Sequence, residues 1–353
     1  MTDFVIVGQG LAASVLMHSF HQAKISFKVV GNDELSSCSK VAAGIWNPIV
    51  FKRLTKSWLA EEVVPCLTNF YSSCENTLDA SFITQRPIIK PFTEEQEKQL
   101  WKKKAKNELC EFLNGDVRSD IPETLSSCNI PNQYGEVKQC GNLHVAEFLK
   151  ASTLFFKEFL FSETFDYSAL QLQSDRVIYK TIEAKKIIFC EGHLVKHNPF
   201  FKWIPLKPAK GEILTIEAPG LKLKNLIFNK NGFLMDVATN VYKVGATYAW
   251  DDFNDASTQK ALTELEQKLK HMTSCAYKVL KHEAGVRPSS IDRRPIIGTH
   301  PKYDNLFVFN GLGTKGVMLA PYFAKNFVDF YLKRATIHSE VDVSRFYHLY
   351  ANE

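Results

Sequence analysis

Three glycine-rich segments could bind an anionic ligand through their backbone groups. The first reads GQGLAA at residues 8–13 and directly follows an apolar run at residues 4–7. Gly8 permits a tight turn, and Gly10 lets the backbone approach a pyrophosphate that then lies on the N-terminus of the following helix. Ala13 is small enough for that helix to pack closely on a sheet. The segment therefore predicts a dinucleotide site, and a plain tight turn is the alternative.

The acidic residue expected at the end of the second strand of such a site is missing. Gly31 occupies its place in the run VVGND at residues 29–33. Asp33 stands two residues later and could reach a ribose hydroxyl. A solvated turn residue is an equally good interpretation of Asp33.

The second glycine segment, GVRP at residues 285–288, carries a restrained arginine. Arg287 lies between a glycine turn and Pro288, and its planar guanidinium suits a carboxylate. A structural ion pair is the alternative role for this side chain.

The third segment, GLGTKG at residues 311–316, opens the last long helix. Its free N–H groups and partial positive charge could stabilise phosphate or an anionic ring system. Lys315 lies at this helix N-terminus, which is unfavourable for a cation that lacks an anionic partner. We therefore favour a ligand-binding role for Lys315 over that of a solvated cation.

The elements that position these segments alternate between strands and helices at both ends of the chain. Apolar runs predict strands at residues 4–7, 27–30, 176–179, 186–190 and 306–309. The sequence pattern predicts one helix that follows the first glycine turn and ends near residue 22. It predicts further helices at residues 92–113, 145–159, 256–271 and 317–333. Residues 207–250 alternate like an antiparallel sheet. The fold class is therefore α/β (α+β overall). A Rossmann-type domain comprises residues 1–75, 141–200 and 286–353, and a second domain comprises residues 76–140 and 201–285.

Composition narrows the class of protein further. The 353 residues exceed the usual size of one core, and the formal net charge of +5 does not by itself indicate nucleic-acid binding. We find neither a membrane-spanning apolar run nor a signal peptide, and therefore expect a cytoplasmic protein without membrane association. The eight cysteines form no C-x-x-C pair, so we expect reduced thiols and no metal site.

Taken together, the segments resemble the D-amino-acid oxidase and glycine oxidase family of FAD-dependent oxidoreductases. Residues 39–48, a run of small residues, are similar to that family's flavin-facing loop, and residues 187–192 to its middle flavin-contacting strand and turn. Residues 285–298 and 311–321 are similar to its C-terminal flavin segment. The resemblance implies a Rossmann-type FAD-binding domain with an antiparallel-sheet substrate domain.

The resemblance also implies roles for individual residues. The first glycine motif would hold the pyrophosphate, residues 39–45 would flank the ribityl chain and ring, and residues 313–318 would cradle the pyrimidine end of the ring. Arg287 matches the arginine that binds the substrate carboxylate. Lys315 and Tyr248 are the other catalytic candidates, although Tyr248 is more simply interpreted as cavity wall. The cofactor-binding candidates are Gly8, Gly10, Leu11, Ala12, Asp33, Ser39, Ala42, Ala43, Gly44, Ile45, Tyr167, Gly192, Gly313, Lys315, Gly316, Val317 and Met318.

The implied reaction is oxidation of the C–N bond of an amino acid or secondary amine. A hydride passes from the α-carbon to flavin N5, the imine hydrolyses, and oxygen or another acceptor reoxidises the flavin. The partners are thus a small amine and an electron acceptor. We expect the FAD to be non-covalent, because no cysteine follows Cys275 in the region where covalent relatives attach it.

Two alternatives stay open. Residues 292–295 and 311–321 also resemble the oxidase half of the bifunctional enzyme that modifies the wobble uridine of tRNA, which acts on a carboxymethylaminomethyl group. A protein of that kind would bind tRNA. The other alternative is a flavin-binding protein without turnover. Two departures from the glycine oxidase pattern are Gly31, in place of the acid, and GTK at residues 313–315, in place of a bulkier sequence with another arginine.

Overall fold

The computed structural model describes residues 1–32, 38–250 and 252–351, and its largest sheet joins strands from distant parts of the chain. The eight strands of this sheet are β1 (Thr2–Val7), β2 (Phe27–Gly31), β10 (Leu160–Ser162), β11 (Leu170–Leu172), β12 (Val177–Tyr179), β13 (Ile182–Phe189), β19 (Ile296–Thr299) and β20 (Leu306–Asn310). The order β10-β2-β1-β13-β20 is parallel throughout. β11, β12 and β19 add antiparallel pairs at the margin.

Four helices that pack against one another accompany the parallel strands. They are α1 (Leu11–Gln22), α3 (Ala60–Leu78), α5 (Val145–Phe155) and α7 (Gly316–Tyr331). The central strands are apolar on both faces, as expected for a sheet covered on both sides. The ring of Phe4 on β1 packs against Phe20 of α1 and Phe327 of α7. This contact packs the C-terminal part of α1 against β1 and α7.

The opposite face of the sheet is covered by short helices and aromatic loops. η4 (Gly192–His197) and η6 (Val343–Phe346) belong to this layer. Phe189 of β13 is fully buried there and lies 5.8 Å from the ring of Phe201. Both faces of β13 are therefore covered, so its carboxyl end is rigidly placed.

A second, seven-stranded sheet is mostly antiparallel. Its order is β18 (Lys278–Arg287), β14 (Ala209–Glu217), β17 (Val241–Gly245), β16 (Phe233–Ala238), β15 (Ile227–Asn229), β7 (Ile88–Pro91) and β8 (Tyr134–Val137). The helix α6 (Gln259–Met272) buries Leu265 and Leu269 in one apolar cluster with Leu214 and Val244 of the sheet. The sheet and α6 thus share a core separate from that of the parallel strands.

Short elements complete the described residues. Two small sheets consist of β3 (Ile45–Trp46), β9 (Gly141–Leu143) and β6 (Ile83–Gln85), and of β4 (Ile49–Val50) and β5 (Thr55–Lys56). The remaining helices are α2 (Cys38–Val41), α4 (Glu95–Ala105), η1 (Glu123–Leu125), η2 (Lys157–Phe159), η3 (Tyr167–Ala169), η5 (Gly313–Lys315) and α8 (Tyr347–Tyr350).

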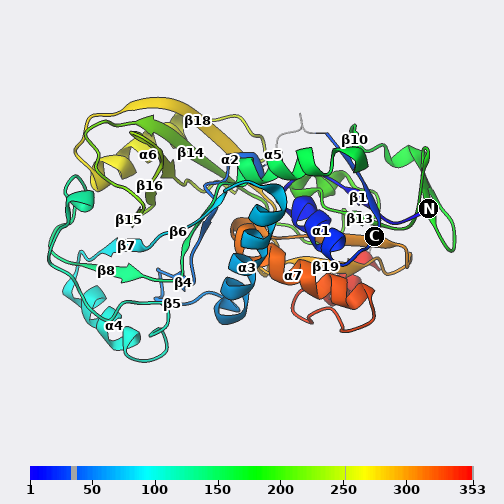
Figure 1. Cartoon of the computed structure of the whole chain (residues 1–353), viewed down its shortest axis with the longest axis horizontal. Coiled ribbons are helices and arrows are strands. Elements are labelled where there is room, and N and C mark those ends of the chain that lie inside the picture. The colour runs from blue at the N-terminus through cyan, green and yellow to red at the C-terminus, as the bar shows by residue number, and fades with distance from the viewer. Residues whose placement is uncertain (33–37, 251, 352–353) are drawn as a thin grey trace.

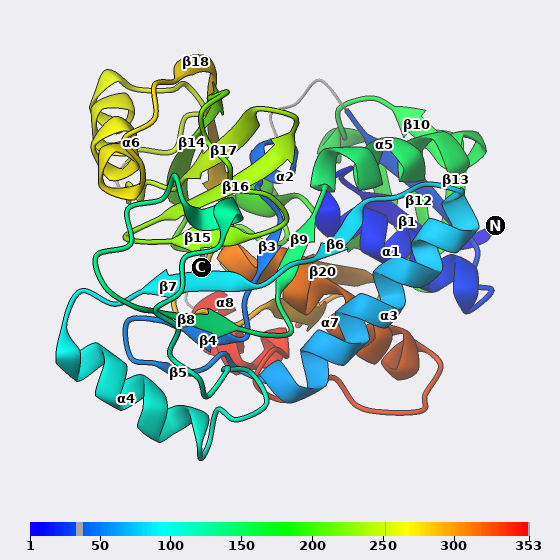
Figure 2. The same ribbon diagram turned by 60° about the vertical axis from the view of Figure 1, so that its left-hand side comes forward.

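The two large sheets lie on opposite sides of the molecule. Figure 1 shows β14, β16, β18 and α6 on one side and β1, β13, α1 and α7 on the other, and Figure 2 shows β3, β6 and β9 between them. The predicted α/β class with a parallel and an antiparallel sheet is confirmed, whereas the exact domain boundaries stay a prediction. In the part of the chain that the structure describes, no helix is both long and apolar enough to span a lipid bilayer.

Two helices differ from the sequence-based expectations. α3 was not predicted, and α4 covers only residues 95–105 of the helical pattern at residues 92–113, the rest of which forms turns and a bridge. Residues 256–271 and 317–333 form α6 and α7 to within a few residues of their predicted bounds.

Candidate functional site

A cavity of about 1100 Å³ is lined by both large sheets. Its walls include the β1–α1 turn, the segment around α2, the end of β13, the strands β14, β16, β17 and β18, and the start of α7. Of the predicted site residues, the cavity is lined by Gly8, Gly10, Leu11, Ala12, Ser39, Ala42, Ala43, Gly44, Ile45, Tyr167, Gly192, Tyr248, Arg287, Gly313, Gly316 and Val317.

One end of the cavity offers the N-terminus of α1, to which the N-cap residue itself contributes no side chain. Gly10 is the N-cap residue and makes no side-chain cap, and the first turn carries no acidic residue. Ser39 Oγ accepts a hydrogen bond of 3.2 Å from Leu11 N–H. Gly8 has φ +113°, and a β-carbon there would lie 2.6 Å from the carbonyl oxygen of Cys190. The turn is therefore held against β13, and the helix N-terminus stays open to an anion.

Gln9 lies beside the position where the acid of the second strand is missing. Its side chain is 3.0–3.2 Å from the place that a β-carbon on Gly31 would occupy. Its Oε1 is buried without a hydrogen-bond partner among the described residues. A hydroxyl of a bound ligand would supply that partner. The predicted contact from Asp33 falls outside the described residues.

A buried carboxylate lies at the same end of the cavity, directly after β13. Glu191 accepts hydrogen bonds from the hydroxyl of Tyr167 and from Asn198 Nδ2, the latter at 2.7 Å. Burial raises the pKa of this carboxyl to about 6. The sequence predicts a cofactor contact for the neighbouring Gly192 but not for Glu191, because Glu191 stands in no motif with a characteristic spacing.

The small-residue loop reaches the cavity as predicted. Gly44 has φ +72°, and a β-carbon there would overlap the carbonyl oxygen of Leu143 on β9. Ile45 begins β3, which pairs with β9. This close approach places the backbone of residues 42–45 along the cavity wall, where a flat ring could lie against it.

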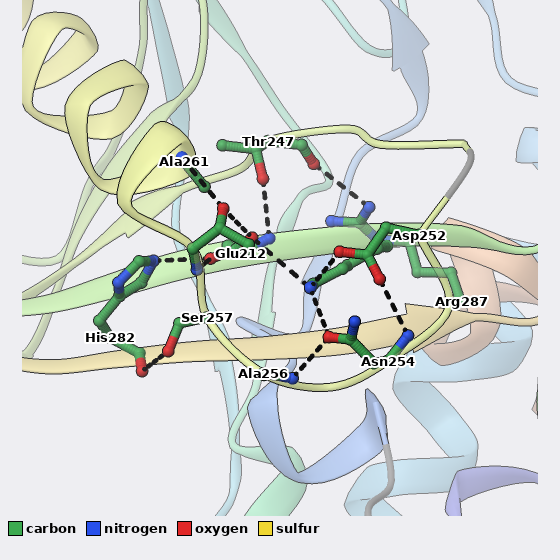
Figure 3. Close-up of polar contacts among 11 residues, drawn as sticks. Glu212, Thr247, Asp252, Asn254, Ala256, Ser257, Ala261, His282 and Arg287 are labelled. Carbon is green, nitrogen blue, oxygen red and sulfur yellow. Dashed lines mark hydrogen bonds and ion pairs between the residues drawn. The ribbon is translucent and has the colours of Figure 1, made fainter.

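Arg287, at the end of β18, presents a guanidinium without a carboxylate partner among the described residues. Its Nη1 donates to Thr247 O at 3.4 Å (Figure 3). Its guanidinium carbon lies 4.6 Å from the ring centre of Tyr248. A β-carbon on Gly211 would overlap the guanidinium. Burial lowers the pKa of Arg287, which is the effect of desolvation on an unpaired cation.

A hydrogen-bonded network behind Arg287 fixes the surrounding backbone. Thr247 Oγ1 accepts a hydrogen bond of 3.0 Å from Glu212 N–H (Figure 3). The carboxylate of Glu212 in turn accepts hydrogen bonds from the backbone N–H and the hydroxyl of Thr258. Thr258 is the N-cap of α6. His282 Nε2 lies 2.8 Å from the same carboxylate. The network thus ties the carbonyl that holds Arg287 to the start of α6.

The C-terminal glycine segment is divided between the cavity and the interior. Gly313, Gly316 and Val317 line the cavity, whereas Met318 is buried outside its lining. Lys315 is also outside the lining, and its Nζ donates to Ser57 Oγ at 2.8 Å. Burial, and secondarily the charge of Arg294, lowers the pKa of Lys315 to about 8. Lys315 and Met318 therefore do not line the cavity, and their predicted ligand contacts stay predictions.

Several lining residues were not predicted from the sequence. The substrate side of the cavity, around Arg287, is also lined by Lys268 of α6, by Phe233 of β16 and by Asn229 and Asn231 around the β15–β16 turn. These residues stand in no recognisable motif. Only the pairing of the antiparallel strands and the packing of α6 bring them to the cavity.

Comparison with known proteins identifies the family to which the chain belongs. A family model described as FAD dependent oxidoreductase matches residues 3–330. The chain belongs to that family. Its cofactor is FAD, and the family is one of oxidoreductases.

Individual relatives narrow the comparison without settling the substrate. Glycine oxidase from Bacillus licheniformis is 30% identical over 147 residues, 40% of this chain and 39% of that protein. The tRNA 5-methylaminomethyl-2-thiouridine biosynthesis bifunctional protein MnmC from Legionella pneumophila (strain Corby) is 25% identical over 175 residues, 41% of this chain and 26% of that protein. The chain thus matches less than half the length of either relative. The crystal structure of glycine oxidase from Geobacillus kaustophilus has a TM-score of 0.78 at 18% identity and covers 98% of this chain and 97% of that one.

The cavity residues fit FAD. The open N-terminus of α1 suits a pyrophosphate, the unpartnered Oε1 of Gln9 suits a ligand hydroxyl, and the loop around Gly44 leaves room for a ring. Among the described residues, no group of three or more His, Cys, Asp or Glu side chains could hold a metal ion.

Proposed function

We propose that this protein oxidises the C–N bond of an amino acid or of a secondary amine that carries a carboxylate. The observation that supports this most directly is Arg287, a partly buried guanidinium in the cavity with no carboxylate partner among the described residues. A substrate carboxylate would supply that partner in a bidentate contact. Several relatives are named glycine oxidase, after glycine, an amine that carries a carboxylate.

The bound flavin would accept the hydride from the substrate carbon next to nitrogen. The chain holds it through the backbone of Gly8 and Gly10 at the pyrophosphate and through residues 42–45 and 313–317 at the ring. Gln9 would bind a hydroxyl of the cofactor in place of the missing acid. These assignments are part of the proposal.

The chain itself would orient the substrate and exclude water. Arg287 binds the carboxylate, and the ring of Tyr248 covers the guanidinium from the solvent side. The carboxylates among the described residues of the lining are Glu163 and Glu191, and both follow strands of the parallel sheet. Among the described lining residues, no carboxylate belongs to the antiparallel sheet that carries Arg287, so we expect the amine to bind unprotonated.

An oxidase for a modified uridine in tRNA is the second candidate, and an exposed aromatic pair favours it. Tyr248 and Trp250 are exposed and stacked with ring centres 6.5 Å apart, and Lys207 lies over Trp250. Exposed rings beside cations are suited to stacking on unpaired bases. Tight tRNA binding that weakens steeply with salt would favour this candidate over a free amino acid.

Anaerobic mixing of the FAD-loaded protein with a panel of amines tests the proposal. Carboxylated amines should bleach the flavin absorbance. Arg287→Ala should lower kcat/KM for them by roughly tenfold to a few hundredfold, because a hydrogen bond to a charged group contributes about 1.5–3 kcal/mol. Arg287→Lys should recover only part of the loss, because lysine cannot make the bidentate contact.

Lys281→Ala is the matched control, because Lys281 lies on the same strand as Arg287 but is exposed. It should retain the flavin and the rate of the unmodified protein. Arg287→Ala should also retain the flavin. Loss of the flavin from Arg287→Ala, or equal losses with carboxylated and plain amines, would show that Arg287 is structural. Absence of bleaching by every amine would support the non-catalytic alternative.

A further inference from the structure

We propose that the substrate carries a second acidic group, and that Lys268 of α6 binds it while Arg287 binds the carboxylate next to the amine. The inference rests on the proposed function and specifies its substrate class. It would make this protein selective for amines with two acidic groups, such as imino diacids or amino acids with an acidic side chain.

The two cations contact neighbouring carbonyl groups of one backbone segment. Lys268 Nζ donates to Ala246 O at 2.9 Å, and Arg287 Nη1 donates to Thr247 O at 3.4 Å. Both side chains line the same cavity. Because consecutive Cα atoms are about 3.8 Å apart, the two cationic groups lie within roughly 12 Å of each other.

That separation suits a short molecule with an acid at each end. A charge-assisted hydrogen bond takes about 2.8 Å at each end. The remaining span is that of two carboxylates joined by a few atoms, with the amine between or beside them.

The cations are held in place before any ligand arrives. The Glu212 network ties Thr247 to Thr258, the N-cap of α6 (Figure 3). α6 carries Lys268 three turns further on, so the strand segment that holds Arg287 and the helix that holds Lys268 are fixed relative to each other. The β-carbon position of Gly232 lies 3.5 Å from Lys268 Cδ, which places the stem of this lysine against the β15–β16 turn.

The remaining groups at this end of the cavity are compatible with an anion. The charge of Lys268 is offset by Glu264, but that carboxylate is 44% exposed and the contact is an i,i+4 pair on the helix surface, which contributes little. Asn229 and Asn231 also line the cavity, and their side chains make no hydrogen bond among the described residues. Their amides could donate to the same acidic group.

Binding of non-reactive acids to the FAD-loaded protein tests the subsite without turnover. Calorimetry and the shift in the flavin spectrum would compare glutarate, a dicarboxylate, with butyrate, a monocarboxylate of similar length. Glutarate should bind about tenfold more tightly or better. Lys268→Gln should lower this preference ratio about tenfold, Lys268→Arg should preserve most of it, and Lys270→Gln, on the exposed side of α6, should leave it unchanged.

Turnover provides the second readout. The ratio of kcat/KM for iminodiacetate to that for sarcosine should exceed one and should fall about tenfold in Lys268→Gln. Equal binding of glutarate and butyrate by the unmodified protein would overturn the inference, as would an unchanged preference ratio in folded, yellow Lys268→Gln. If glutarate is preferred through Lys268 but no amine reduces the flavin, the subsite stands as an acid-binding site and the proposed oxidation is wrong.

Discussion

At the scale of single residues, the two glycines of the first motif have different tasks. Gly8 has a positive φ and lies against Cys190, so a side chain there would strain the backbone and collide with β13. Gly10 has φ −83°, which any residue can adopt, and it lines the cavity. Gly8 is therefore required by the fold, whereas the backbone sets no such requirement at Gly10, where the predicted pyrophosphate contact is the reason for a glycine.

This difference makes Gly10 the better test of the cofactor site. Gly10→Val should fold but lose FAD, because the added side chain would occupy the space of the pyrophosphate. Flavin absorbance per protein after purification, with circular dichroism to confirm folding, measures the effect. A folded Gly10→Val protein with full flavin content would mean that the pyrophosphate binds elsewhere.

Residue types and spacing predict which backbone turns line the cavity, but they do not predict where the long side chains point. Lys315 stands in the correct segment, yet its ammonium group lies on Ser57 rather than in the cavity. Lys268 and Glu191 line the cavity without any motif, because strand pairing and helix packing place them there. Spacing therefore identifies where a backbone turns, whereas tertiary contacts decide which side chains face the ligand.

At the scale of elements, α1 buries a histidine among apolar side chains. His18 is 2% exposed, its Nε2 lies 2.9 Å from Ser152 Oγ of α5, and Phe148 and Phe156 surround its ring. Burial lowers the pKa of His18 to about 4, from an ordinary value of 6.5. The contact between α1 and α5 is thus built for the neutral imidazole.

The sign of the resulting pH dependence follows directly. Between about pH 6.5 and 4 the unfolded chain binds a proton at His18 that the folded protein does not bind, so stability falls as pH falls through this window. The loss from this group is up to about 3 kcal/mol. In urea unfolding at pH 7, 6 and 5, His18→Gln should lose less stability on acidification than the unmodified protein.

Exposed His271 provides the control, because His271→Gln should keep the pH dependence of the unmodified protein. An identical pH dependence in His18→Gln would mean that the imidazole becomes protonated without opening the α1–α5 contact.

The helices with ordinary end signals were predictable, and α3 was not. Thr258 is the N-cap of α6, and its side chain accepts a hydrogen bond from Ala261 N–H. The buried residues of α6 recur every three to four positions, as expected for a helix with one apolar face. α3 begins after Leu59 and ends at Asp79, both with positive φ and neither of them the usual capping residue for its end. It also contains Pro65, which normally indicates a helix boundary. Packing against α7 overrides these local signals.

At the scale of the whole molecule, both large sheets contribute to the wall of one cavity. The order of elements predicted a parallel sheet from separated segments, and that prediction is confirmed. The antiparallel sheet was predicted only for residues 207–250, because β7 and β8 come from a region without regular patterning. Register across such distant strands depends on contacts that no local pattern encodes.

The same architecture predicts a cofactor held without a covalent bond. The cysteines that line the cavity are Cys38 and Cys190, and burial raises the pKa of both thiols. Neither is therefore an activated nucleophile. Acid precipitation should release all the flavin into the supernatant, as measured by its absorbance. Yellow colour retained in the washed precipitate would contradict this.

The position of β20 and α7 late in the chain has a consequence for biosynthesis. The glycine turn at residues 8–13 leaves the ribosome early, but β20 completes the sheet beside β13, and α7 packs on α1. Nearly 300 residues separate the turn from β20, which corresponds to roughly 15–60 seconds of translation. During that time the nascent chain has an exposed turn and no enclosed cavity. FAD is thus acquired only after α7 has been synthesised, and each nascent chain must persist for a time as an apoprotein without its flavin.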